Sequence, residues 1–223
     1  MRKQFYFIRL MVAVVVAAVL AGTSAVRAQQ ADITSWLHLG AEYELKEKGL
    51  ALESGLEWRT EDRFRRTDRV SLSADGAYEV LPWLEVGAGY ELHFRQKSHD
   101  WGIRHRYRLQ AVLSTRLWER LKVSLRERFQ HTLDGDDENE LRLRSRVKLA
   151  YDLPRSRVEP YASVEAFNGL ACGEQFRVTR LRYRGGAQFP LVGSWDGELF
   201  YIYQDDRGKE GRHVLGVKCV YRF

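Results

Sequence analysis

The chain ends on the sequence LGVKCVYRF, residues 215–223, and this stretch decides the expected fold. Its apolar residues recur at every second position, namely Leu215, Val217, Cys219, Tyr221 and Phe223. Small or basic residues fill the positions between them, with Val220 as the exception. Because successive side chains of a β-strand point to opposite faces, the stretch is predicted to be a strand with one apolar and one mostly polar face.

The same alternation recurs upstream through most of the chain. Residues 84–95 read LEVGAGYELHFR and residues 103–113 read IRHRYRLQAVL. Charges recur at every second position in such segments, whereas an amphipathic helix would repeat them every three or four residues. About eleven segments of this kind lie between Trp36 and Phe223, and each is near the ~9 to 11 residues that a tilted membrane strand needs.

The spacing of the segments favours a membrane barrel over a soluble β-sandwich. Their connections alternate between short turns and longer charged loops, as in transmembrane barrels. Aromatic residues also gather near the segment ends, where interfacial girdles lie in such barrels: Trp36, Trp58, Tyr78, Trp83, Tyr90, Trp118, Tyr151, Tyr183, Tyr201, Tyr203 and Tyr221. We therefore predict an all-β fold, an antiparallel up-and-down transmembrane β-barrel of about 10 to 12 strands, present as a monomer.

The strand count raises a question of parity. Bacterial single-chain barrels normally have an even number of strands and both termini on the same side. An odd count would start the first strand on the opposite side. Either one strand is missed, or residues 29–35 pass through the lumen.

The N-terminal residues have the pattern of a secretory signal peptide. Basic residues precede an apolar run over 10–20, and small residues then lead to Ala28. The run is shorter than the ~20 residues that a transmembrane helix needs. We predict a cleaved signal peptide over residues 1–28 and a single barrel domain over residues 29–223, with an uncleaved anchor as the alternative.

The charge of the chain does not predict a nucleic-acid partner. The formal net charge is +6, but 4 of the 36 basic residues lie before residue 29, which leaves 32 bases against 30 acids. Residues 29–100 carry 9 bases and 14 acids, and residues 101–223 carry 23 bases and 16 acids. This asymmetry is better explained by two parts of one chain that face each other than by a basic tail.

If the apolar rows of a barrel face lipid, the charged rows must face the lumen, because hydrocarbon does not tolerate exposed charge. The later strands would contribute Arg104, Arg106, Arg108, Arg126, Arg128, Arg142, Arg144, Arg146, Arg180, Arg182 and Arg184. The earlier strands would contribute Glu42, Glu53, Glu57 and Glu91. In one interpretation these charges pair and plug the lumen. In the other, the surplus arginines form a track for a carboxylated or phosphorylated solute.

The sequence gives only weak indications of catalytic groups. His93 and Glu91 share one inward row, but the pattern places no nucleophilic Ser or Cys with them. Ser98, His99 and Asp100 are neighbours in the chain, and adjacency does not give a catalytic triad its geometry. We predict no catalytic residue, and an enzyme that acts on lipid or peptide remains an alternative.

Metal sites and disulfides are not predicted either. The acidic stretch 134–138 could hold Ca²⁺, but it lacks the spacing of an EF-hand. Cys172 and Cys219 lie in different surroundings, a glycine-flanked loop and an apolar strand face, which disfavours a bridge. We expect no cofactor and no metal.

The terminal stretch resembles the closing strand of bacterial outer-membrane β-barrels, which ends on an aromatic residue. In those proteins the ending is read during assembly, so the resemblance implies that Tyr221 and Phe223 form an assembly signal. It also implies an outer-membrane location in a Gram-negative bacterium. The implied partners are outer-membrane lipid, the barrel-assembly machinery and the secretion pathway.

The recurring hairpins resemble domain-of-unknown-function family 2490, a group of outer-membrane proteins. The resemblance rests on Trp36, on GAEYEL at 40–45, on 50–59 with its terminal Arg59, on GAGY at 87–90 and on RYRLQ at 106–110. It implies a barrel in the outer membrane and brings no catalytic residues. The chain also resembles small acidic-sugar porins, more weakly, in size and arginine placement.

Together these observations predict an outer-membrane barrel of unassigned role. It would be structural, or a narrow and weakly anion-selective pore with an arginine-rich lumen. A porin for small acidic solutes, such as acidic oligosaccharides, is the alternative.

Overall fold

The computed structural model describes residues 33–61, 65–97, 100–134, 139–170, 177–208 and 210–223. The described residues form eleven β-strands and one short 3₁₀ turn, η1. Their bounds are β1 (Ile33–Leu45), η1 (Lys46–Lys48), β2 (Leu50–Glu61), β3 (Arg66–Leu81), β4 (Leu84–Lys97), β5 (Asp100–Trp118), β6 (Leu121–Asp134), β7 (Glu140–Tyr151), β8 (Glu159–Gly169), β9 (Val178–Pro190), β10 (Trp195–Asp206) and β11 (Arg212–Arg222). Among these residues, no helix is long and apolar enough to cross a membrane.

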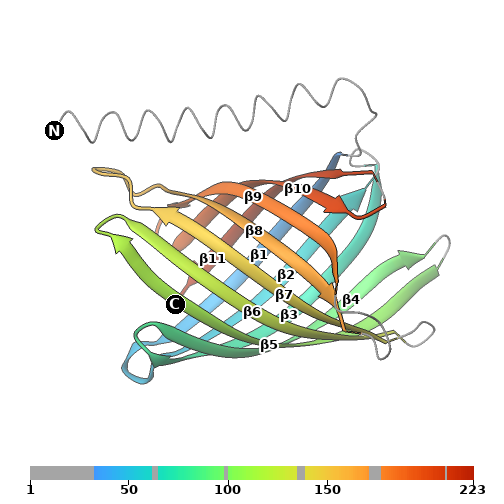
Figure 1. The fold of residues 1–223 in the computed structure, drawn as a ribbon, viewed down its shortest axis with the longest axis horizontal. Helices are drawn as coiled ribbons and strands as arrows, with labels where there is room; N and C mark the ends of the chain where they lie inside the picture. The colour runs from blue at the N-terminus through green and yellow to red at the C-terminus, as the bar shows by residue number, and fades with distance from the viewer. Residues whose placement is uncertain (1–32, 62–64, 98–99, 135–138, 171–176, 209) are drawn as a thin grey trace. The chain divides into compact units, whose positions relative to one another are not determined.

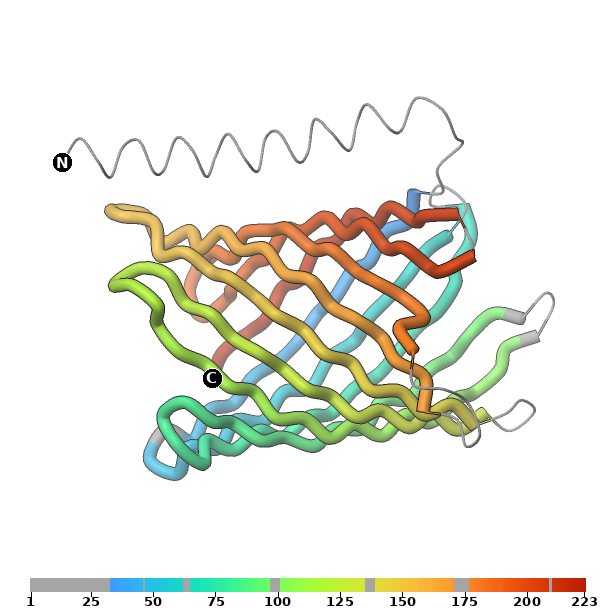
Figure 2. Tube along the Cα trace, viewed as in Figure 1, coloured from blue at the N-terminus to red at the C-terminus, as the bar shows by residue number. Residues whose placement is uncertain are grey.

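The strands close into a barrel in which each strand lies beside its neighbours in the sequence (Figure 1). Every pair from β1–β2 to β10–β11 is antiparallel. The strands run obliquely along the barrel wall (Figure 2), as closure of a sheet requires. The all-β barrel predicted from the alternation is confirmed, and the strand number of the described residues falls within the predicted range.

The barrel closes through a parallel pair, β1 and β11, so it is not antiparallel throughout. Their register runs from Ile33 opposite His213 to Glu42 opposite Arg222. The cause is parity: when hairpins join an odd number of strands, the first and the last run in the same direction and can pair only in parallel. The odd count therefore needs no missed strand. Residues 33–35 lie in the wall as part of β1, which overturns a lumen path for them, and residues 29–32 lie outside the described residues.

The two ends of the barrel are named here by the termini that they carry. At the carboxyl end β11 finishes, and at the amino end β1 begins. The connections span 2 to 7 residues at the carboxyl end and 2 to 8 at the amino end, so the expected alternation of short turns and longer loops is weak. Gly49, in the β1–β2 turn, has a φ of 60°, a conformation that glycine adopts without strain.

Burial in the barrel is inverted relative to a soluble protein. Large apolar side chains on the outer face are exposed, among them Leu39, Leu109 and Leu215. Polar side chains are fully buried inside, among them Ser71 and His93. A β-sandwich would instead join its apolar faces in a core, so the wall fits a barrel surrounded by lipid.

Candidate functional site in the barrel lumen

The alternation of β5, β6, β7 and β9 turns their arginines into the lumen in adjacent rows. Arg126 on β6 lies opposite Arg146 on β7, and Arg128 lies opposite Arg144. Like charges that face each other across strands destabilise a sheet. These rows therefore require carboxylates among them.

Glu165 on β8 supplies one such carboxylate. Its Oε1 lies 2.6 Å from Arg126 Nη2, and its Oε2 lies 2.9 Å from Arg144 Nη2 and 3.6 Å from Arg182 Nη1. Glu165 is only 4% exposed. The inward position on β8 explains this sharing, because β8 lies between β7 and β9 and Glu165 is directly opposite Arg182.

Glu91 on β4 is likewise shared by arginines, in this case two arginines of β5. Its Oε2 lies 3.1 Å from Arg108 Nη1 and 3.4 Å from Arg106 Nη1. Arg108 also reaches Asp75 on β3, with an Nη2–Oδ2 distance of 2.7 Å. The early acids thus pair with bases of an adjacent or nearly adjacent strand.

Trp36 links the two sides of the lumen. The Arg59 guanidinium carbon lies 3.5 Å from the centre of the Trp36 ring, and that of Arg182 lies 4.9 Å from it. Trp36 is on β1 and Arg182 on β9, with β11 and β10 between them in the wall, so the indole and the guanidinium meet inside the barrel. The interpretation of Trp36 as an interfacial girdle residue is wrong, because Trp36 belongs to the row of β1 side chains that face the lumen.

We call this group the charge layer: Trp36, Arg59, Glu91, Arg106, Arg144, Glu165 and Arg182. Each member lies in the half of its strand that is nearer the amino end of the barrel. Arg106 pairs with Glu91, and Arg144 and Arg182 share Glu165. Contacts at this level therefore join β4 to β5, β7 and β9 to β8, and β2 and β9 to β1.

Neutral partners complete the hydrogen bonding of the layer. Gln130 Oε1 accepts a hydrogen bond from Arg144 Nη1 at 3.1 Å, and Gln204 Oε1 accepts one from Arg182 Nη2 at 2.7 Å. The Phe167 ring lies 4.5 Å from the Arg144 guanidinium carbon and 4.8 Å from that of Arg182. These contacts orient the planes of the guanidinium groups and stabilise their positive charge.

Four more of the predicted arginines pair along the wall. Arg104 pairs with Asp134, Arg142 with Glu140, Arg180 with Asp206 and Arg184 with Glu198. Arg184 Nε also donates to Tyr161 Oη at 2.6 Å. Glu57, on β2, pairs with Arg59 of its own strand through two hydrogen bonds of 2.7 and 2.9 Å.

Three lumen arginines differ from the others. Arg69 and Arg146 each have a buried Nε without a hydrogen-bond partner, and neither forms an ion pair within the described ranges. Arg128 donates to the neutral Gln110 Oε1, with an Nε–Oε1 distance of 3.0 Å, and has no carboxylate partner in the same ranges. The lumen therefore keeps positive charge that the described carboxylates leave unpaired.

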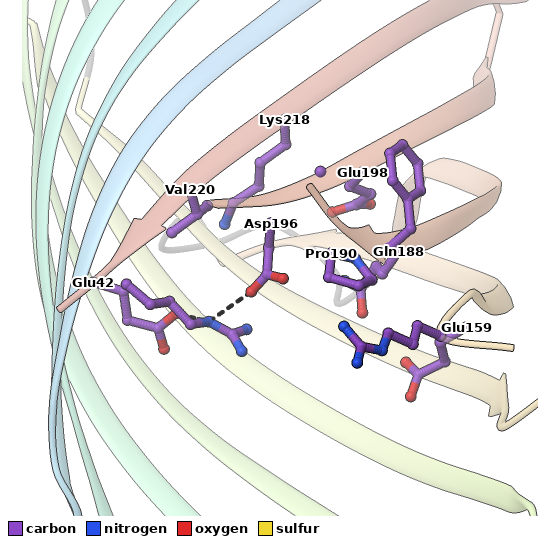
Figure 3. Close-up of a pocket in the computed structure, with 12 residues that line it drawn as sticks. Glu42, Glu159, Gln188, Pro190, Asp196, Glu198, Lys218 and Val220 are labelled. Atoms are coloured by element: carbon purple, nitrogen blue, oxygen red, sulfur yellow. Dashed lines mark hydrogen bonds and ion pairs between the residues drawn. The ribbon is translucent and has the colours of Figure 1, made fainter. Parts of the chain in front are cut away.

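A cavity of about 250 Å³ opens at the carboxyl end, along β8 to β11 and β1 (Figure 3). Arg222 bridges Glu42 and Asp196 there, with Nε–oxygen distances of 3.1 and 2.9 Å. Lys218, also on its lining, lies 2.6 Å from Glu53 Oε1. The predicted residues Glu42 and Glu53 thus lie away from the charge layer, at the opposite end of the lumen.

The paired residues His93 and Glu91 have a neighbour that the sequence pattern did not reveal. Ser71 Oγ lies 2.8 Å from His93 Nδ1, and Glu91 Oε1 lies 3.3 Å from the same nitrogen. A nucleophile–base–acid relay uses both ring nitrogens, whereas His93 Nε2 has no hydrogen-bond partner in the described residues. His93 is 1% exposed, so the cluster packs the wall beside the charge layer.

The terminal aromatic residues lie at the carboxyl end. The Tyr221 ring lies 5.3 Å from that of Trp195 and 4.8 Å from that of Phe223. Phe223 N donates to Glu42 O at 3.0 Å across the parallel seam. Their role as an assembly signal stays a prediction.

Several sequence predictions fall outside the described residues: the signal peptide, Ser98, His99, residues 135–138 and Cys172. Cys219 is a free cysteine on the apolar row of β11. Within the described ranges, no group of three or more His, Cys, Asp or Glu side chains is arranged to hold a metal ion.

Comparisons with known proteins identify the family. A family model described as "Protein of unknown function (DUF2490)" matches residues 33–214. No curated protein matches the chain. Among solved structures, the translocator domain of the autotransporter NalP from Neisseria meningitidis is similar over 77% of this chain and 73% of that one, with 16% sequence identity and a TM-score of 0.45.

Proposed function

Because the chain belongs to the DUF2490 family, whose description assigns no role, we propose its function from its own lumen: an outer-membrane β-barrel closed at rest by the charge layer. The exposed apolar wall supports a membrane location. The outer membrane is supported by the barrel architecture, since bacterial barrels of this kind are outer-membrane proteins. Cell fractionation tests that location.

The observation that carries the proposal is the contact inside the barrel between groups of strands that are not neighbours in the wall. Arg182 and Arg59 both contact the Trp36 ring, and Glu165 draws three guanidinium groups together. Bidentate and shared guanidinium–carboxylate contacts are strong and directional. An ion that crosses the lumen would have to break several of them at once.

Single-channel recording of the purified protein in a planar bilayer tests closure. We expect rare or no conductance steps from the wild type. Trp36→Ala should give frequent steps, because it removes the ring on which Arg59 and Arg182 stack. Trp118→Ala, at an outer position near the carboxyl end, is the matched control and should stay silent.

A narrow anion-selective pore is the second candidate function. It is favoured by Arg69, Arg128 and Arg146, which lack carboxylate partners among the described residues. Guanidinium groups of this kind bind carboxylates and phosphates well, so small acidic solutes are the proposed cargo.

A salt gradient across the same bilayer separates the two candidates. Anion-selective steps from the wild type, reduced when Arg69, Arg128 and Arg146 are replaced by Gln, would favour the pore. Silence of the wild type with steps from Trp36→Ala would favour the closed barrel. Persistent, unselective wild-type steps would contradict both.

A further inference from the structure

Glu127, near the middle of the barrel wall, faces outward instead of into the lumen. Glu127 lies between the inward Arg126 and Arg128 on β6, so it shares the outer face with Leu125 and Phe129. Those neighbours are 37% and 40% exposed. Glu127 is the seventh of the 14 residues of β6, which places it near the middle of the wall.

Small side chains surround this carboxylate. The register places Ala111 of β5 and Ser145 of β7 directly opposite Glu127, and Ala166 of β8 opposite Ser145. Figure 1 shows β5, β6, β7 and β8 side by side in the wall. Ser145 Oγ donates a hydrogen bond of 2.7 Å to Glu127 Oε2. Glu127 is half-buried, and its short alanine and serine neighbours leave space beside it on the outer face.

Among the described residues of β5 to β8, no Lys or Arg shares the outer face with Glu127. The outward positions of the described residues of β5, β7 and β8 carry no Lys, Arg, Asp or Glu. An ionised carboxylate accepts about four hydrogen bonds, and Ser145 provides one. Ionisable groups at membrane depth are costly, and they almost always face protein or water rather than lipid.

We propose that the β5–β8 wall around Glu127 is a docking surface for a membrane-embedded segment of another protein that carries a Lys or Arg side chain. The proposal rests on the proposed membrane location of the barrel. Charge complementarity identifies the partner: a carboxylate in hydrocarbon gains most from a cationic donor. The small residues around it let another backbone approach closely, as small residues do between membrane helices.

Two other occupants fit less well. A second copy of this chain would bring no countercharge, because the outward rows of its described strands carry no Lys or Arg away from the strand ends. Lipid headgroups lie at the membrane surfaces, whereas Glu127 lies near the middle of β6. A basic residue within a transmembrane segment reaches that depth.

The probe is a synthetic transmembrane helix of about 20 Leu and Ala residues with one central Lys, reconstituted with the protein in phosphatidylcholine vesicles. A matched peptide carries Leu at the central position. A hydrophobic carbodiimide, which modifies carboxyl groups within the membrane, reports whether Glu127 is covered. Modification of residue 127 is read by mass spectrometry, and peptide association by energy transfer.

We expect the Lys peptide to associate and to protect residue 127, and the Leu peptide to do neither. Glu127→Gln should weaken the association by a few-fold to roughly tenfold, the scale of polar contacts between membrane segments. Glu127→Gln combined with Leu199→Glu keeps an outward carboxylate but moves it to β10. This control should not restore the association.

Protease resistance of the reconstituted protein shows whether it is inserted. A protein that fails to insert would overturn both the membrane proposal and this one. An inserted protein that binds the two peptides equally, or whose association is restored by Leu199→Glu, would overturn the docking surface alone. Association of two protein copies through Glu127 in place of the peptide would also overturn it.

Discussion

Glu165 holds three guanidinium groups with its two carboxylate oxygens, at distances of 2.6 to 3.6 Å. Such a cluster is sensitive to change because burial of charge is costly unless each charge is compensated. Loss of the carboxylate would leave Arg126, Arg144 and Arg182 facing one another. We therefore propose that the stability of the barrel and the closure of its lumen depend on the same residue.

Glu165→Gln should lower the free energy of unfolding by about 3 to 5 kcal/mol, the usual cost of breaking a buried ion pair from one side. Urea unfolding in detergent micelles, followed by tryptophan fluorescence, measures it. Glu42→Gln is the matched control, because the Arg222 side chain that it pairs with is 62% exposed and such pairs contribute about 0 to 1 kcal/mol. Equal losses from both changes would contradict the role given to Glu165.

Residue by residue, the sequence predicted the arginine rows better than their partners. Strict alternation on β5, β7 and β9 shows which face each arginine occupies. Glu165 was missed because its inward row on β8 also holds Tyr161 and Phe167, so that row does not look polar. Trp36 was misread because an aromatic residue near a strand end fits a girdle as well as a lumen, and only the parity of β1 separates the two.

Among the elements, the pairing of β1 with β11 was the feature that the alternation of apolar and polar residues could not predict. Each hairpin follows from local sequence, because its turn brings adjacent segments together. The closing pair has no turn, and its direction depends on the total number of strands. Ten hairpin connections joining the strands of the described residues make β1 and β11 run the same way.

The native Cys219 offers a test of this seam, since it lies opposite Leu39 in the parallel register. Paired strands lie ~4.8 Å apart, within the Cα separation that a disulfide spans. In a Cys172→Ser background, Leu39→Cys should form a disulfide with Cys219 upon mild oxidation. Non-reducing electrophoresis and mass spectrometry would detect it.

Leu45→Cys is the control, on the same face of β1 but six residues further along, or roughly 20 Å away. It should not cross-link. Efficient cross-linking from position 45, or none from position 39 in a folded barrel, would contradict the parallel seam.

For the whole molecule, the apolar outer wall and the charged lumen act together. The wall suits a lipid surrounding, and the charge layer lies in the lumen, in the half of the barrel nearer its amino end. The cavity at the carboxyl end is lined by residues that do not belong to the charge layer. An inserted and closed barrel is therefore the state that we propose.

Ion efflux from vesicles that contain the wild-type protein tests this most directly, once protease resistance has shown that the protein is inserted. We expect potassium and chloride efflux no faster than from protein-free vesicles, with Trp36→Ala as the positive comparison. Rapid efflux from the inserted wild type, equal to that of Trp36→Ala, would contradict a lumen closed by the charge layer.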